Sequence, residues 1–188
     1  MNKTLRYIIF NKPFNVLSQF TSEDGARNLS EFNLPKDVYA AGRLDKDSEG
    51  LLLLTNDGPL IKKLLEPEEK SWKTYLVQVE KVPSREALKK LEDGVSIKGG
   101  KTLPAQVELL LDEPVVWKRD PPIRERKNIP TAWIRLKIRE GKNRQVRRMT
   151  AAVGHPTLRL IRESIAGISL DDLEIGSWRE INKNHIFK

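Results

Sequence analysis

The sequence predicts an α+β fold with a mixed, largely antiparallel sheet and flanking helices. Segments of alternating polar and apolar residues outnumber segments with helical spacing. The two kinds do not follow one another in the strict order that a parallel α/β fold requires. The 188 residues are enough to bury a core. This length suits either one large domain or two small lobes that share a cleft.

The first part of the chain is predicted to hold short strands and one turn of helix. Residues 6–10 are rich in Ile, Tyr and Phe and run into Asn11-Lys12-Pro13, which suits the end of a strand. The four-leucine run at residues 51–54 is brief and lies between two turn signals, so we expect a strand buried on both faces. The other expected elements are strands over 16–20 and 38–41 and a helical turn over 28–32.

The middle of the chain is predicted to hold two helices and several strands. Pro59 is placed to begin a short helix. Residues 73–80 alternate, with Tyr75 on the same face as two valines, which predicts a strand. Ser84 suits the cap of a helix that ends at Gly94. The strands expected to follow it cover residues 95–97 and 106–111.

The last part of the chain begins with a segment that lacks any periodicity. Residues 117–130 are dense in cations and prolines, so we expect a long loop whose charge suits a phosphate backbone, with a solvated connector as the alternative. Asn143 is expected to cap a helix that buries an apolar stripe and ends at Gly154. The remaining expected strands cover residues 132–138, 157–161 and 178–181.

Composition restricts the classes of function. Lys and Arg outnumber Asp and Glu by 34 to 26, a formal net charge of +8, which favours a polyanionic partner. The chain has no cysteine, which excludes thiol catalysis and disulfides. His155 and His185 lack metal-ligand spacing, and no nucleotide-binding loop is present. We therefore expect a site that works without a cofactor or metal. Apolar runs are too short for a signal peptide or a membrane span, so we expect a cytoplasmic protein.

Charged residues at positions 42–50 lie directly before the leucine run. If the chain is extended up to Asp45, then Arg43 and Asp45 project from the same face, and the arginine keeps the carboxylate ionised. From the residues alone, Asp45 is a nucleophile, a general acid or base, or a turn residue satisfied by Arg43. Asp47 and Glu49 would complete a two-carboxylate glycosidase site, although acids are common in turns.

Three arginines lie in the first turns of the last predicted helix: Arg144, Arg147 and Arg148. The helix dipole prefers acids there, by roughly 0.3 to 1 kcal/mol for each charge. We therefore expect an anion to compensate them, either a phosphate of a bound nucleic acid or a carboxylate such as Asp45. The alternative is a solvated basic face.

Four stretches together resemble the family of the A-type pseudouridine synthase of the small ribosomal subunit, over nearly the whole chain. They are Phe10-Asn11-Lys12-Pro13, Gly42-Arg43-Leu44-Asp45-x-x-Ser48-x-Gly50 with the leucine run that follows, Lys73-x-Tyr75, and Glu140-Gly141-x-x-x-Gln145-Val146-Arg147-Arg148-Met149. Most members carry an S4-type RNA-binding domain before the catalytic part. Tyr7 already resembles the catalytic part, so we expect no such domain. Arg144 and the segment from Pro121 favour a member that acts on large-subunit ribosomal RNA.

The resemblance implies the pseudouridine synthase fold, in which residues 1–188 form a single catalytic domain of two lobes that share a central RNA-binding cleft. It also implies an isomerase that converts one uridine of large-subunit ribosomal RNA to pseudouridine. It implies that Asp45 is the catalytic aspartate, either as the nucleophile that attacks C1′ of the uridine or as a group that otherwise assists cleavage of the glycosidic bond. It implies that Tyr75 stacks on the base, with removal of the C5 proton as a second role, and that Arg147 pairs with the aspartate while Arg43 supports it. The residues from which we expect RNA contacts are Lys12, Arg119, Arg124, Arg126, Lys127, Lys142, Arg144 and Arg148. We expect a monomer that acts without a membrane partner or a small-molecule cofactor.

Two alternatives make different predictions. A non-catalytic RNA-binding or ribosome-associated protein of the same fold would function unchanged with Asp45→Asn. If the protein is an enzyme, the Asp45→Asn variant should form no pseudouridine but should still bind RNA. A glycoside hydrolase would be damaged as severely by Asp47→Asn or Glu49→Gln as by the change at Asp45.

Overall fold

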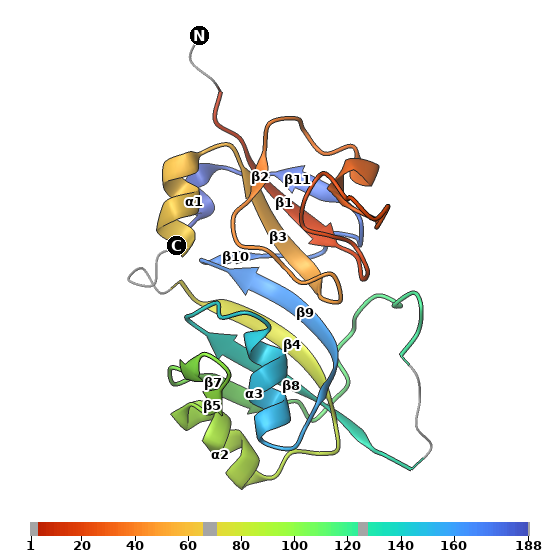
Figure 1. Cartoon of the computed structure of the whole chain (residues 1–188), viewed down its shortest axis with the longest axis vertical. Helices are drawn as coiled ribbons and strands as arrows, with labels where there is room; N and C mark the ends of the chain where they lie inside the picture. Colours follow the sequence, from red (N-terminus) through yellow and green to blue (C-terminus); the bar gives the residue numbers. More distant parts are fainter. Residues whose placement is uncertain (1–3, 66–70, 124–127, 188) are drawn as a thin grey trace. The chain divides into compact units, whose positions relative to one another are not determined.

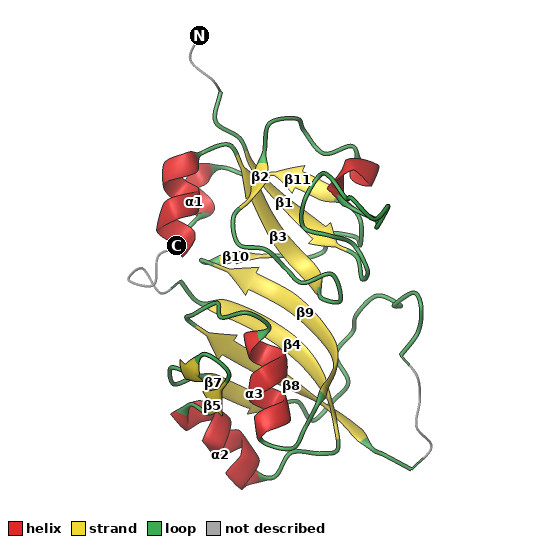
Figure 2. Ribbon diagram, viewed as in Figure 1, coloured by secondary structure: helices red, strands yellow, loops and turns green. Residues whose placement is uncertain are grey.

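The computed structural model describes residues 4–65, 71–123 and 128–187, and in these ranges it contains three α-helices, two 3-10 helices and eleven strands (Figures 1 and 2). The chain divides into two compact units. Unit 1 comprises Met1–Ser71 and Arg162–Lys188, and unit 2 comprises Trp72–Ile161. The predicted α+β class with a largely antiparallel sheet is confirmed. That the units share a cleft stays a prediction. No helix in the described ranges is long and apolar enough to cross a membrane.

Unit 1 is built around β1 (Tyr7–Lys12), which pairs antiparallel with both β3 (Glu49–Thr55) and β11 (Trp178–Glu180). Every residue of β1 and β3 is buried, so the predicted burial of the leucine run on both faces is confirmed. The other elements of unit 1 are β2 (Tyr39–Ala40), β10 (Ile168–Ser169), α1 (Gly58–Leu65) and the 3-10 helices η1 (Leu29–Phe32) and η2 (Lys183–His185).

Asp57 joins several elements of unit 1 at the start of α1. Its carboxylate accepts the backbone N–H of Leu60 at 3.1 Å, the hydroxyl of Tyr7 at 2.8 Å and the ammonium of Lys183 at 2.7 Å. The hydrogen bond from Lys183 holds the pKa of Asp57 below its ordinary value. One buried carboxylate therefore caps α1 and also ties β1 to η2.

Unit 2 contains the long pair of β4 (Lys73–Glu80) and β8 (Thr131–Ile138), antiparallel over all eight residues, with β7 (Gln106–Leu109) on the other side of β8. Its other elements are α2 (Arg85–Asp93), α3 (Gln145–Ala152) and the hairpin of β5 (Ser96–Ile97) and β6 (Gly100–Lys101). The predicted cap of α2 is confirmed, because the Ser84 hydroxyl accepts the N–H of Ala87 at 3.2 Å. Strand β9 (Thr157–Ile165) begins in unit 2 and ends in unit 1.

Two predictions about elements are wrong. Residues 16–20 form no strand, and only Leu17 makes an isolated bridge, to Asn28. The Val16 carbonyl accepts the Lys12 ammonium at 2.7 Å instead of a strand partner. Asn143 does not cap α3 either. Its side-chain oxygen accepts the Arg148 guanidinium at 2.8 Å, and the cap position falls to the next residue, in the left-handed region.

The predicted end of α3 is confirmed, and β9 is longer than predicted. The N–H of Gly154 bonds to the Ala151 carbonyl at 3.0 Å, and that of His155 bonds to the Thr150 carbonyl at 2.9 Å. This is a Schellman ending, with Gly154 at a φ of 86°. Strand β9 continues past residue 161 through Arg162, which the hydrophobic pattern does not anticipate because arginines are seldom buried.

Candidate active site

Asp45 lies in unit 1, on a loop over residues 42–48 that enters β3 directly. Burial alternates along this loop, because Arg43 is exposed, Leu44 is buried and Asp45 is half-buried. The alternation fits the expectation that Arg43 and Asp45 project from the same face. The ion pair between them stays a prediction.

Main-chain hydrogen bonds hold both ends of this loop. At its start, the Gly42 carbonyl accepts a guanidinium N–H of Arg162 at 3.1 Å, and Arg162 also donates to the Leu51 carbonyl at 2.7 Å. Beyond Asp45, the Lys46 carbonyl accepts the N–H of Asn15 at 2.8 Å. Arg162 is only 2% exposed, so water does not compete for its hydrogen bonds. The loop therefore presents Asp45 from a fixed backbone.

Lys12 lies beneath the same loop and has no exposed surface. Its ammonium donates to the carbonyls of Pro13 at 2.9 Å and Val16 at 2.7 Å, with a longer contact of 3.5 Å to Lys46. Burial lowers the pKa of Lys12 to about 7, although the negative charge of Glu49 opposes the shift. A side chain without exposed surface cannot reach a phosphate, so we withdraw Lys12 from the residues expected to contact RNA.

Glu49 and Asp47 differ in their surroundings. Glu49 is the first residue of β3 and is 1% exposed, and its charge acts on the Lys12 ammonium. Asp47 is half-buried in the turn that closes where the Ser48 N–H meets the Asp45 carbonyl at 3.0 Å. The catalytic acid of a glycosidase must contact the sugar, and the buried Glu49 carboxylate does not suit that role. Its charge acts on the buried Lys12 instead.

Tyr75 and Arg147 lie in unit 2. Tyr75 sits on β4 opposite Leu136 and is 8% exposed. Arg147 is half-buried on α3, and its helix also buries Val146 and Met149 in the predicted stripe. Asp45 and Arg43 belong to the other unit, so the predicted meeting of Arg147 with Asp45 stays a prediction.

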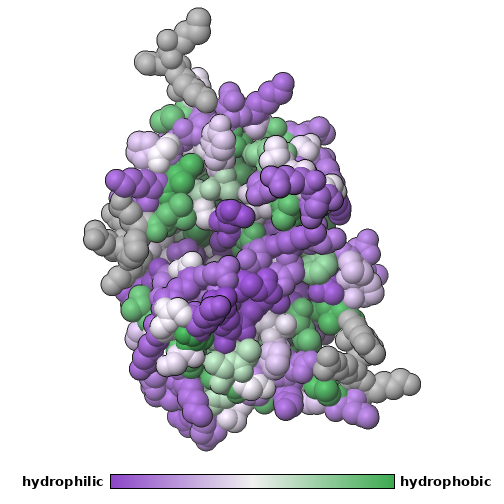
Figure 3. All heavy atoms as spheres, in the orientation of Figure 1, coloured by the Kyte–Doolittle hydropathy of each residue, from purple (hydrophilic) through white to green (hydrophobic). Residues whose placement is uncertain are grey.

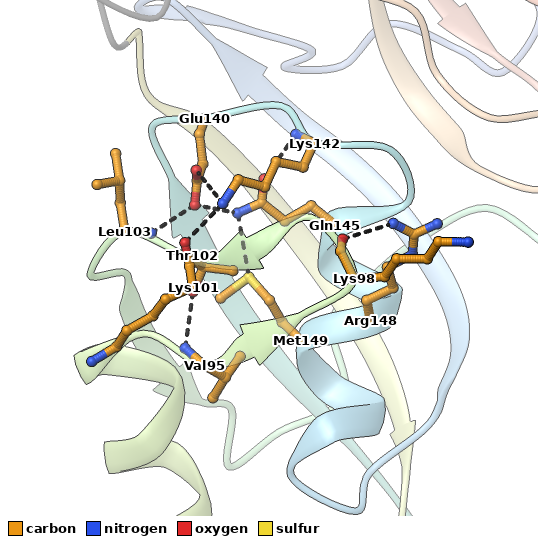
Figure 4. A network of polar contacts seen from close by, with 10 residues as sticks. All are labelled: Val95, Lys98, Lys101, Thr102, Leu103, Glu140, Lys142, Gln145, Arg148 and Met149. Carbon is orange, nitrogen blue, oxygen red and sulfur yellow. Dashed lines mark hydrogen bonds and ion pairs between the residues drawn. The ribbon is translucent and has the colours of Figure 1, made fainter.

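A polar network holds the start of α3 (Figure 4). The Gln145 side chain accepts the N–H of Lys142 at 2.9 Å and donates to the Glu140 carboxylate at 2.7 Å. Glu140 also accepts the N–H of Leu103 at 2.7 Å and forms an ion pair with Lys142 at 3.4 Å. The network fixes the start of the helix that carries Arg147. The first turn of this helix contains no acidic residue.

Cations expected to bind RNA gather near this helix start. Lys142 is half-buried and its ammonium bonds to the Lys101 carbonyl at 2.8 Å. Arg148 is half-buried and donates to the Lys98 carbonyl at 3.2 Å, and Arg144 is exposed. In the view of Figure 3, strongly hydrophilic atoms cover the region of α3.

The other cations predicted to bind RNA follow residue 117 in the sequence. Arg119 donates to the Pro121 carbonyl at 2.8 Å. Arg124, Arg126 and Lys127 fall outside the described residues. Within the described ranges, no cluster of His, Cys, Asp and Glu side chains is arranged to hold a metal ion. That the reaction needs no cofactor stays a prediction.

Comparison with known proteins agrees with this arrangement. The model of the RNA pseudouridylate synthase family matches residues 6–152. A "Ribosomal large subunit pseudouridine synthase E" of Vibrio parahaemolyticus is 57% identical over 176 residues, which cover 94% of this chain and 74% of the relative. Its namesake from Xanthomonas axonopodis pv. citri is 58% identical over 168 residues, 88% of each chain. A solved structure titled "Crystal structure of pseudouridylate synthase" has a TM-score of 0.79 and 29% identity, covering 96% of this chain and 72% of its own.

Proposed function

Because the chain belongs to the RNA pseudouridylate synthase family, we propose that it isomerises one uridine of large-subunit ribosomal RNA to pseudouridine. The relatives of more than 50% identity carry the name of a large-subunit enzyme, which supports this choice of substrate. The observation that carries the proposal is the position of Asp45, a half-buried carboxylate on a loop whose two ends are bonded to the body of unit 1.

The reaction that we assign to Asp45 conserves every atom. Its carboxylate attacks C1′ of the ribose as the bond from C1′ to N1 of uracil breaks, and the base turns. A new bond then forms from C5 to C1′ as the bond from the Asp45 carboxylate to C1′ breaks, which frees the aspartate. The C5 proton leaves, and N1 gains a proton. No electrons enter or leave, so the isomerisation needs no redox partner and no source of energy.

The remaining residues serve this step. We propose that Tyr75 stacks on the base and that Arg147 pairs with the Asp45 carboxylate. A uridine in folded RNA has to leave its stack to reach the carboxylate, and cations around α3 such as Arg144 and Lys142 hold the flanking phosphates while it does. The cationic composition of the chain supports this role.

The test is the map of pseudouridines in large-subunit ribosomal RNA from cells with and without this chain. We expect one position to lose its pseudouridine without the chain and to regain it with the wild type. Asp45→Asn should lower the yield there by at least about a thousandfold, since it removes the nucleophile while changing little else.

Asp47→Asn is the matched control, because it removes a carboxylate from the same loop two residues further on. The control should restore the modification. If no position depends on the chain, the assignment as an enzyme is wrong. If Asp45→Asn restores the modification, the non-catalytic alternative replaces it. Equal loss with Asp47→Asn would favour a mechanism with two carboxylates.

A further inference from the structure

The residue before Asp45 is held by a single hydroxyl group from a distant part of the chain. Ser18 donates its hydroxyl to the Leu44 carbonyl at 2.8 Å, and the same oxygen accepts the Leu44 N–H at 3.1 Å. Twenty-six residues separate the two. Both are buried. The Ser18 hydroxyl thus makes the two main-chain hydrogen bonds that a neighbouring strand would otherwise make to Leu44.

This double contact is hard to replace. Leu44 belongs to no strand, so its two main-chain groups have no regular ladder to satisfy them. A hydroxyl is both a donor and an acceptor, and one group can therefore serve both. Buried main-chain groups that lose their partners must find others. Without the hydroxyl, the loop has to shift at Leu44, and Asp45 shifts with it.

Ser18 is itself on anchored backbone. The N–H of Leu17 bonds to the Arg27 carbonyl at 2.9 Å, and the Gln19 carbonyl accepts the N–H of Leu29 at 2.9 Å. One residue further back, the Val16 carbonyl accepts the buried Lys12 ammonium. The hydroxyl is therefore a fixed reference point against which Leu44 is placed.

We propose that Ser18 is the positioning residue that sets the orientation of the Asp45 carboxylate, an inference that rests on the proposed function of Asp45. Arg162 and Asn15 hold the two ends of the loop, and Ser18 holds its middle, one residue from the reacting group. Ser18 acts through the backbone of Leu44. Its loss should therefore slow the chemical step and leave the binding of RNA unchanged.

The test compares Ser18→Ala with the conservative Ser18→Thr, which keeps a hydroxyl. The assay is tritium release from protein-free large-subunit ribosomal RNA labelled at C5 of uridine, taken from cells that lack this chain. We expect Ser18→Ala to lower the single-turnover rate at saturating enzyme by about tenfold to a hundredfold, since small misplacements of a reacting group cost that much. The enzyme concentration for half-maximal rate should change less than about twofold, and Ser18→Thr should recover most of the rate.

Thr55→Val is the matched control for lost stability. The hydroxyl of Thr55 also makes a double contact, donating to the Arg6 carbonyl at 2.6 Å and accepting the N–H of Asp57 at 3.1 Å, but at the end of β3 away from Asp45. The control should lose stability and keep the single-turnover rate. Hydrogen exchange followed by NMR should show a faster Leu44 amide in Ser18→Ala only.

Each remaining outcome has a definite meaning. If Ser18→Ala keeps the wild-type rate, or if Thr55→Val slows the reaction equally, Ser18 has no positioning role, although the proposed function stands. If Asp45→Asn releases tritium as fast as the wild type, the proposed function fails and this inference fails with it. A folded Ser18→Ala whose Leu44 amide exchanges as slowly as in the wild type also overturns it.

Discussion

The two units hold their charged residues in different ways. In unit 1 the loop of Asp45 is bonded through its main chain to buried side chains, including the cations Lys12 and Arg162. In unit 2 the start of α3, which carries Arg147, is held by a network of side chains that includes the half-buried Glu140. Both arrangements fix a short segment, but water can replace lost partners more easily in the second.

This difference has a physical consequence. A carbonyl that loses a buried cationic donor stays in a low-dielectric interior, and the full cost of leaving it unsatisfied appears in the stability. A partly exposed group that loses its partner is hydrated instead. Substitutions in the buried set of unit 1 should therefore cost more than equivalent substitutions around α3.

The largest expected effect on stability comes from Arg162→Met. The change removes hydrogen bonds to the carbonyls of Leu51 and Gly42 and keeps much of the side-chain volume. We expect the free energy of unfolding to fall by about 3 kcal/mol or more, since each charged hydrogen bond contributes about 1.5 to 3 kcal/mol. Urea denaturation measures this loss.

The matched control for Arg162→Met is Arg179→Met. Arg179 is half-buried, with a side chain that is 39% exposed, and its guanidinium forms ion pairs with Asp171 at 2.8 Å and Asp172 at 3.3 Å. Its loss should cost less than about 1 kcal/mol, as is usual for ion pairs at a surface. If both variants lose the same free energy of unfolding, buried hydrogen bonds of arginine contribute no more to stability here than ion pairs at the surface.

The second prediction concerns pH. Burial lowers the pKa of Lys12 from 10.5 to about 7, so at pH 7 to 10 the unfolded chain binds a proton that the folded chain has lost. The stability contributed by Lys12 should therefore rise with pH in this range, by at most about 1.4 kcal/mol for each pH unit, and stay constant below it.

Lys12→Met removes the titrating group and isolates its effect. The difference in free energy of unfolding between wild type and variant should change between pH 7 and pH 9, whatever the other groups contribute. Two parallel stability curves over this range would mean that Lys12 keeps an ordinary pKa despite its burial.

The smallest expected effect is that of Gln145→Ala in unit 2. Gln145 is itself buried, and the change removes its hydrogen bonds to the Lys142 N–H and to Glu140. Water can replace these in part because Lys142 and Glu140 are half-buried. We expect a loss of about 1 kcal/mol in the free energy of unfolding. Gln78→Ala serves as the control, since the Gln78 side chain makes an exposed contact of 3.3 Å to Thr131. A loss as large as that of Arg162→Met would show that the network of α3 is as tightly coupled as the buried set.

Elements with a local signal could be predicted from the sequence. Strand β4 has the predicted bounds because its alternation is local, and α2 begins at the predicted cap because Ser84 bonds only three residues away. The predicted Asn143 cap is wrong because the Arg148 guanidinium binds the same side-chain oxygen. The predicted strand over 16–20 is wrong because the ammonium of the buried Lys12 binds the Val16 carbonyl. Both competitors are identifiable only once their side chains are placed.

The candidate site divides in the same way. Asp45, Tyr75, Arg43 and Arg147 could be singled out from motifs and their spacing, whereas Ser18 and Arg162 could not. Arg162 had one usable signal, a cation directly after Leu160 and Ile161. Ser18 had none, because a serine near a turn is ordinary and its partner is far along the chain.

Local patterns in the sequence were enough for the class of fold and most of its elements, and they placed Asp45 directly before the buried leucine strand. These depend on periodicity, turn residues and spacing, which act over a few neighbouring positions. The folded structure was needed to establish that Lys12 is interior, that Glu49 is buried, and that Ser18 holds Leu44. Burial and hydrogen bonding depend on groups that folding brings together from distant parts of the chain, and no local pattern records them.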